Sequence, residues 1–200
     1  MSPEALARRI RKLARVSPDA VVTSVDLARR LLGPRPVVVY DRLASGAQLS
    51  QSEDGYRIEV RMDLPDMNFA IAHELGHWAI RVVEGERPEN EEELASSVAA
   101  ALLMPAPVVR SIVEQHGRGF GPIRPLARAT ATSQTAAHLR LGEVLGDERA
   151  VVTAKGRHVL LRTRGAVPWS EVPLTEPEKL DGWRTGDVRI ATRRLRGGID

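Results

Sequence analysis

The sequence contains no cysteine, which excludes disulfide bridges and any metal site built from thiolates. Aromatic residues make up only 4% of the 200 residues, whereas hydrophobic residues as a class make up 42%. The chain can therefore bury a substantial core, but that core must rest mainly on alanine, valine and leucine. A length of this size suits one domain, or one domain with a small appendage.

Long apolar runs are missing as well. No run approaches the roughly 20 residues that a membrane-spanning helix needs. The N-terminus passes from Met1-Ser2-Pro3-Glu4 into an arginine-rich amphipathic segment without the apolar stretch of a secretory signal. These absences predict a cytoplasmic protein with no membrane partner. The formal net charge of +3 is a mild basic excess, so direct DNA binding is compatible with the sequence but not favoured.

The most informative stretch runs from Asn68 to Ile80 and contains His73-Glu74-Leu75-Gly76-His77, an H-E-x-x-H pattern. Its apolar residues predict a buried helix. Positions i and i+4 of a helix share one face, so His73 and His77 can present two imidazoles to one metal ion. Zinc fits best, because it binds neutral imidazole and its catalytic sites combine three protein ligands with a water. Glu74 would act as general base toward that water.

A chance pair of histidines on a buried helix is the alternative interpretation of this motif. It leaves Glu74 buried between two histidines, and a buried carboxylate is costly unless something pairs with it. A metal ion removes that cost. Gly76 lowers helix propensity by about 1 kcal/mol relative to alanine, and it leaves room for another backbone to approach closely.

A second helix is predicted from Glu91 to Met104. One face of this helix carries small and apolar residues, namely Ala95, Val98, Ala99 and Leu102. Its three leading glutamates favour the positive end of the helix dipole, which would explain all of them without a metal. If one is the third ligand, Glu91 and Glu92 flank the apolar stripe about equally, while Glu93 points away from it. Periodicity alone does not separate the first two.

These features resemble the ImmA/IrrE family, which are zinc metallo-endopeptidases of the gluzincin type. The resemblance covers about residues 20–146. It rests on Leu64-Pro65 followed by Phe69–His77, on the acidic helix leading into Ala99–Pro105, and on a later helical stretch ending in Arg140-Leu141. From the resemblance we expect a zinc peptidase.

The family's second motif reads Glu-x-x-Ala-Asn-x-Phe-Ala. Its glutamate falls on Glu92 and its alanine on Ala95, so the resemblance implies Glu92 as the third zinc ligand beside His73 and His77. This sequence departs from the motif in two places. Ser96 stands where the family has asparagine, and Val98 or its neighbour replaces the phenylalanine. The first departure removes an amide that would support a ligand, so it affects the surroundings of the site more than its existence.

The predicted fold is α+β: a mainly helical zincin-like metallopeptidase core with a small antiparallel sheet, helix-turn-helix-like helices after the core, and a short β-rich C-terminal appendage. The expected helices are Pro3–Val16, Ser24–Leu32, Asp66–Val83, Glu91–Met104, Ala106–Gln115, Leu126–Thr130 and Ser133–Leu145, and the expected core strands are Val37–Tyr40, Ala47–Gln51 and Tyr56–Arg61.

Two units are expected along the chain. Residues 1–146 would form the metallopeptidase domain, with the metal core at about 37–105 and a helical tail at 106–146. Residues 147–200 would form a small extension with a β-hairpin around Lys155-Gly156 and a flexible basic end.

The strand nearest the cleft could bind an extended peptide by adding it to the edge of the sheet. Tyr56–Arg61 alternates apolar and charged residues and is the candidate, with Tyr56 and Ile58 as substrate-binding residues. An ordinary solvent-facing edge is the alternative interpretation of this strand.

The resemblance also implies a substrate: a helix-turn-helix transcriptional repressor, cut to relieve repression in a stress response or in mobile-element control. The alternative is a zinc-containing regulatory protein or a toxin–antitoxin-type module that binds a partner or DNA without proteolysis. Glu74 argues against this alternative, because a structural zinc site needs no base beside its first ligand.

Overall fold

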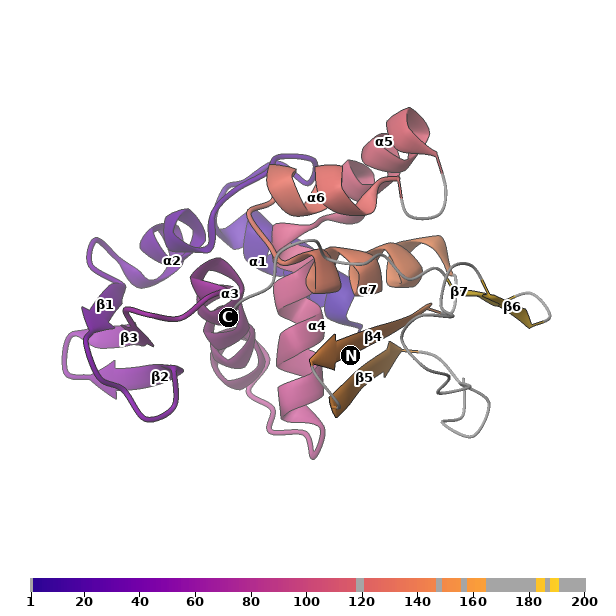
Figure 1. Cartoon of the computed structure of the whole chain (residues 1–200). Coiled ribbons are helices and arrows are strands. Elements are labelled where there is room, and N and C mark those ends of the chain that lie inside the picture. Colours follow the sequence, from indigo (N-terminus) through magenta and orange to yellow (C-terminus); the bar gives the residue numbers. More distant parts are fainter. Residues whose placement is uncertain are drawn as a thin grey trace.

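The computed structural model describes residues 2–117 and 121–146 in full, and beyond them the backbone of four strands at 149–155, 158–164, 183–185 and 188–190. Two adjacent helices, α3 (Met67–Trp78) and α4 (Glu91–Leu103), form the centre of the fold (Figure 1). A small sheet lies on one side of them, and the three helices between residues 106 and 145 lie on the other.

The helices are α1 (Pro3–Leu13), α2 (Ser24–Leu32), α3 (Met67–Trp78) with its π-helical continuation η1 (Ala79–Val83), α4 (Glu91–Leu103), α5 (Ala106–His116), α6 (Ile123–Ala129) and α7 (Gln134–Leu145). They confirm the predicted helices, with ends that shift by a few residues. Side-chain caps explain several starts, because Thr23, Asp66 and Ser133 each accept a hydrogen bond from a first-turn backbone N–H.

The sheet contains β1 (Val37–Tyr40), β2 (Ala47–Ser52) and β3 (Gly55–Arg61) in the order β1-β3-β2. The predicted hairpin is confirmed: β2 and β3 pair antiparallel, and Gly55 takes the positive φ of 118° that follows the turn. The prediction of an antiparallel sheet is wrong in one respect, because β1 runs parallel to β3 and the sheet is mixed. Alternating apolar residues predict a strand but not the direction of its partner.

Two groups of buried side chains meet at the central helices. The first lies between the sheet and α1 to α4 and includes Leu6, Ile10, Leu27, Ile58, Leu75, Ile80 and Leu102. The second lies between α3, α4 and the three later helices and includes Ala99, Leu103, Met104, Val109, Leu126 and Leu141. Trp78 is the only aromatic residue in either buried group, as the low aromatic content requires. The two helices that carry the motifs, α3 and α4, therefore contribute side chains to both buried groups.

Three polar side chains connect distant segments to these helices. The buried Arg11 of α1 donates to the backbone carbonyls of Leu102 and Ser17. Arg140 of α7 donates to the Met104 carbonyl. Asn68, in the first turn of α3, accepts from both the backbone N–H and the hydroxyl of Ser24 and donates to the carbonyls of Thr130 and Ala131. Hydrogen bonds to otherwise unpaired carbonyls at helix ends remove a desolvation cost.

In the C-terminal part, β4 (Arg149–Lys155) pairs antiparallel with β5 (His158–Arg164), on either side of the expected turn, and β6 (Trp183–Thr185) pairs with β7 (Val188–Ile190). The expected basic end lies outside the described residues, and the boundary at residue 146 stays a prediction. Among the described helices none alone is long and apolar enough to span a bilayer; α4 and α5 meet that test only as a pair, with a bend of 61° between them.

Candidate metal centre

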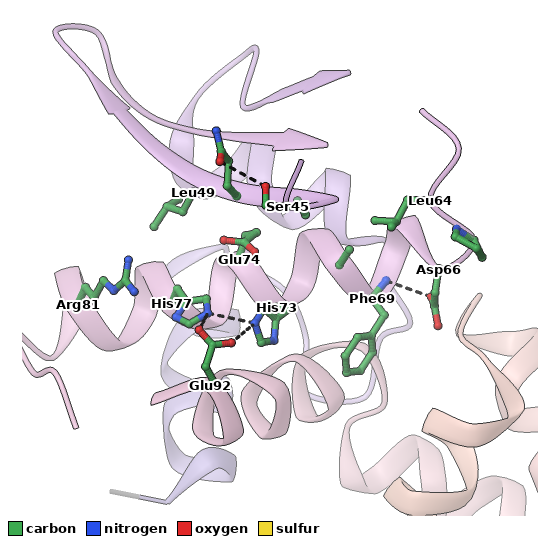
Figure 2. A pocket seen from close by; sticks show the side chains of 14 residues that line it. Ser45, Leu49, Leu64, Asp66, Phe69, His73, Glu74, His77, Arg81 and Glu92 are labelled. Atoms are coloured by element: carbon green, nitrogen blue, oxygen red, sulfur yellow. Dashed lines mark hydrogen bonds and ion pairs between the residues drawn. The ribbon is translucent and has the colours of Figure 1, made fainter. Parts of the chain in front are cut away.

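The helix α3 places the two motif histidines side by side. Figure 2 shows α3 running below β2, with His73 and His77 on the side toward Glu92 and with Glu74 turned toward the strand. The histidines are four residues apart, so they share a face, and their ring centroids lie 4.7 Å apart in an edge-to-face arrangement. The two Nε2 atoms are 3.0 Å apart.

Helix α4 lies very close to α3, and this contact brings a third possible metal ligand to the two histidines. A Cβ atom added to Gly76 would lie 2.7 Å from the Ala95 carbonyl oxygen and 3.0 Å from its Cα atom. Only glycine therefore fits at this crossing, which confirms the expectation that Gly76 admits a neighbouring backbone. The first turn of α4 consequently begins beside the two histidines.

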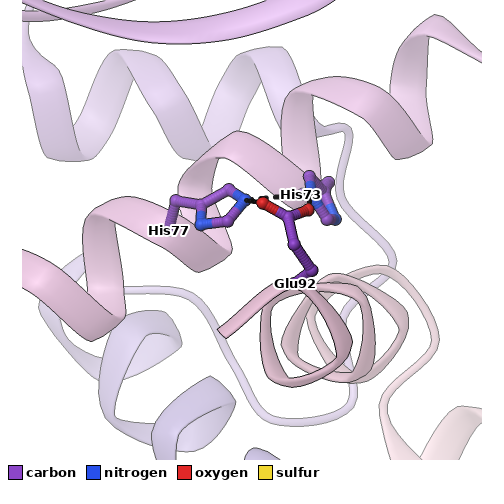
Figure 3. Close-up of side chains that lie close together, drawn as sticks. All are labelled: His73, His77 and Glu92. Carbon is purple, nitrogen blue, oxygen red and sulfur yellow. Dashed lines mark hydrogen bonds and ion pairs between the residues drawn. The ribbon is translucent and has the colours of Figure 1, made fainter. Parts of the chain in front are cut away.

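Glu92 extends from that first turn toward both rings (Figure 3). Its Oε2 lies 3.2 Å from His73 Nε2, and its Oε1 lies 3.3 Å from His77 Nε2. The three potential ligand atoms lie within 4.8 Å of one another, so this cluster could hold a metal ion. Tetrahedral ligands at zinc distances of about 2.1 Å lie roughly 3.4 Å from one another. The observed spacings fit one shared ion.

The Nδ1 atoms of both histidines also have polar partners. His77 Nδ1 lies 2.6 Å from Glu91 Oε1, and Arg81 Nε donates to the same oxygen at 2.6 Å. A carboxylate only accepts, so Nδ1 carries the proton in this contact, and a metal ion would bind His77 through Nε2. His73 Nδ1 lies 3.2 Å from the Ser96 hydroxyl. The serine that replaces the family's asparagine thus contacts a motif histidine directly.

Glu91 is a residue whose role the sequence analysis missed. Its side chain is only 14% exposed, against 81% for Glu92. Burial opposes its ionisation, but the hydrogen bonds from His77 and Arg81 outweigh burial and lower the pKa of its carboxyl. The available signal was its position: Glu91 flanks the apolar stripe of α4 as closely as Glu92 does. Glu93, as expected, does not line the cleft.

Glu74 lies on the other side of α3, facing the sheet. It is 9% exposed. Burial raises the pKa of its carboxyl, while the nearby His77 and a hydrogen bond from the Leu49 backbone act in the opposite direction. Burial, and then His77, lower the pKa of His73. That shift favours the neutral imidazole, which is the form that binds metal ions.

A cleft of about 650 Å³ opens between α3 and β2. It is lined by Ser45, Ala47, Gln48 and Leu49 on the strand side, by Leu64, Pro65, Asp66, Phe69 and Ala70 at the start of α3, and by His73, Glu74, His77, Arg81 and Glu92. The cleft therefore reaches both Glu74 and the donor cluster, which consists of His73, His77 and Glu92.

The prediction that Tyr56–Arg61 forms the edge of the sheet at the cleft is wrong. This strand is β3, the central strand, which pairs with β1 on one side and β2 on the other. Ile58 is fully buried, and neither Tyr56 nor Ile58 lines the cleft. A hairpin pattern does not reveal which of its arms faces a later helix. The strand beside the cleft is β2.

Comparison with known proteins agrees with this geometry. Residues 53–141 match the family model of peptidase M78, described as an IrrE N-terminal-like domain. The matched segment contains α3, α4 and all the residues of the donor cluster, and it confirms the family resemblance noted in the sequence.

A solved structure supports the fold independently. A Mycobacterium tuberculosis transcriptional regulator superposes with a TM-score of 0.60 at 19% sequence identity, over 89% of this chain. The chain spans 59% of the length of that protein. At this identity the similarity shows a shared fold. Comparison with curated protein sequences gives no match.

Proposed function

We propose that this protein is a zinc-dependent endopeptidase, because residues 53–141 match the model of the peptidase M78 family, described as an IrrE N-terminal-like domain. The observation that carries the proposal is the convergence of His73, His77 and Glu92 beside a buried carboxylate in an open cleft. A purely structural metal site would need neither the carboxylate nor the cleft.

In this proposal His73, His77 and Glu92 hold the zinc, and Glu74 is the catalytic base. The zinc supplies Lewis acidity at the carbonyl of the peptide. Glu74 takes a proton from the attacking water and passes it to the departing amine. Its burial suits the first of these steps, because a raised pKa makes the Glu74 carboxylate a stronger base toward the water.

The substrate would lie along β2. This strand is an edge of the sheet, since its only partner in the sheet is β3, and its residues line the cleft above the donor cluster. An extended peptide can add to such an edge through backbone hydrogen bonds. In this proposal the peptide binds at the segment around Gln48 and Leu49 rather than at Tyr56 and Ile58.

For the substrate we propose a helix-turn-helix repressor in the cytoplasm, cleaved to relieve repression in a stress response or in mobile-element control. The family resemblance supports this choice. A second candidate is regulation by partner or DNA binding without proteolysis. The structural neighbour named as a transcriptional regulator favours it, whereas the position of Glu74 beside the donor cluster argues for hydrolysis.

The test is Glu74→Gln, which keeps the shape of the side chain and removes the base. We expect this variant to retain zinc by metal analysis and to lose cleavage of a co-expressed helix-turn-helix repressor by about 100-fold or more. Glu93→Gln, on the same helix as Glu92 but outside the cleft, is the control and should cleave normally. Full cleavage by Glu74→Gln would rule out the mechanism. A wild-type protein that cleaves nothing but binds DNA with a steep salt dependence would establish the second candidate.

A further inference from the structure

The two ends of the cleft differ in charge and polarity. Arg81 lines one end, and Leu64 and Phe69 line the other together with Asp66. Figure 2 shows these groups on opposite sides of the motif residues. Asp66 is fixed, because its two carboxylate oxygens accept from the backbone N–H groups of Phe69 and Ser133. The apolar end thus carries the carboxylate of Asp66, and the opposite end carries the guanidinium of Arg81, which is ion-paired with Glu91.

Arg81 is available to a ligand. Its side chain is 40% exposed. Within the described part of the chain its only hydrogen bond runs from Nε to Glu91 at 2.6 Å. Its two terminal nitrogens are left to pair with an incoming group. A guanidinium binds a carboxylate through two parallel hydrogen bonds and repels ammonium groups.

The spacing along α3 sets where a substrate side chain would meet Arg81. The donor cluster is centred between His73 and His77, so the backbone of Arg81 follows it by at most about 9 Å along the helix axis, and that of Phe69 precedes it by about 9 Å. The Arg81 side chain reaches back toward the cluster, because its Nε contacts the same Glu91 oxygen as His77 Nδ1. An extended peptide advances about 3.3 Å per residue, so each end of the cleft corresponds to a side chain about one to three residues from the bond at the cluster.

We propose that Arg81 is a specificity-determining residue, which selects an acidic side chain about one to three residues from the scissile bond. An apolar side chain on the opposite side of that bond would pack against Leu64 and Phe69. This inference rests on the proposed endopeptidase function. Arg81 also supports Glu91, so its replacement affects zinc binding as well, and the test must separate the two effects.

The experiment uses blocked peptides that are identical except for Asp, Gln or Lys at one position, varied along the peptide. The wild-type protein should show a kcat/KM for Asp about fivefold or more above that for Lys at one position. Arg81→Glu should reverse this preference. The ratio is taken between peptides within one variant, so differences in zinc loading cancel. Arg87→Glu, an exposed arginine outside the cleft, is the matched control and should leave the ratio unchanged.

A binding measurement makes the result independent of turnover. Immobilised Glu74→Gln protein is exposed to the same peptides, and the retained fraction is identified by mass spectrometry. Enrichment of acidic peptides, lost or reversed in Glu74→Gln/Arg81→Glu, supports the proposal. Equal retention of Asp and Lys peptides, or a preference that Arg81→Glu does not change, overturns it. Selective retention together with a wild-type protein that hydrolyses no peptide would overturn the endopeptidase function and leave the role of Arg81 intact.

Discussion

The two faces of α3 are built in opposite ways. Toward α4, Gly76 lies against Ala95 so closely that a single added methyl group would meet backbone atoms. Toward β2, the helix stands away from the strand and leaves a cleft in which Glu74 reaches the Leu49 backbone. At Gly76 one face of the helix has no room for a side chain larger than hydrogen, whereas the other face borders an open cleft.

The closed face of α3 suits the holding of a metal ion, and the open face suits the binding of a substrate. A shared metal ion requires donors fixed to within a few tenths of an ångström, and close backbone contact between α3 and α4 provides this. Binding of a substrate chain requires space and unpaired backbone groups, and the edge of the sheet provides these. Changes on the α4 side should therefore act on zinc affinity, whereas changes on the β2 side should act on turnover with zinc retained.

The largest effect on the α4 side is expected for Glu92→Ala. It removes one of the three donors, so zinc affinity should fall by more than about 100-fold. The side chain is 81% exposed, so the fold should persist in circular dichroism. Metal analysis and competition with a chelator measure the change, and Glu93→Ala is the control. Unchanged zinc in Glu92→Ala would place the third donor elsewhere.

A smaller loss is expected for Glu91→Gln. This change keeps the shape of the side chain but removes the charge that orients His77, and loss of such a contact weakens metal binding by about 10-fold to 100-fold. Chelator competition again measures it. Ser96→Ala, which removes the neutral contact to His73, should have a weaker effect. If Glu91→Gln binds zinc as tightly as the wild type, the charge of Glu91 serves only the helix terminus.

The smallest effect on zinc is expected for Gly76→Ala, which tests the helix contact itself. In a helix without tertiary contacts this change would stabilise by about 1 kcal/mol. Here the new methyl group must push α4 away, so we expect destabilisation by about 1–3 kcal/mol and a modest fall in zinc affinity. Urea denaturation of the zinc-free protein gives the first value. A gain in stability would show that the contact is looser than described.

Local patterns predicted most of the helices and the motif on α3. The spacing of His73 and His77 is a property of one helix, so the sequence is sufficient to place the two rings together. The choice between Glu91 and Glu92 depends on how α4 is rotated against α3. That rotation is set by the contact of Gly76 with Ala95, a tertiary feature that periodicity does not contain.

The strand order was harder to predict for a similar reason. The pattern of β3 is compatible with an edge or a central position, and only the parallel pairing with β1 decides between them. The central position of β3 explains why three consecutive residues are buried, namely Ile58, Glu59 and Val60. Glu59 obscures it in the sequence, because a charged residue is expected to face water. In the fold its carboxylate accepts hydrogen bonds from Gln48 and Arg57.

The hydrogen bonds of Asn68 and Arg11 extend beyond the segment shared with the family. The matched region begins at residue 53, yet Asn68 pairs with Ser24, and Arg11 reaches the last turn of α4. Leu6, Ile10 and Leu27 belong to the same buried group as Leu75 and Leu102. A gene fragment trimmed to the matched boundaries would leave the Asn68 side-chain carbonyl and the Leu102 carbonyl without these partners. It would also expose the apolar side chains of α3 and α4 that pack on α1 and α2. The first fifty-odd residues therefore supply part of the buried core that supports α3 and α4, and a fragment made for expression should include them.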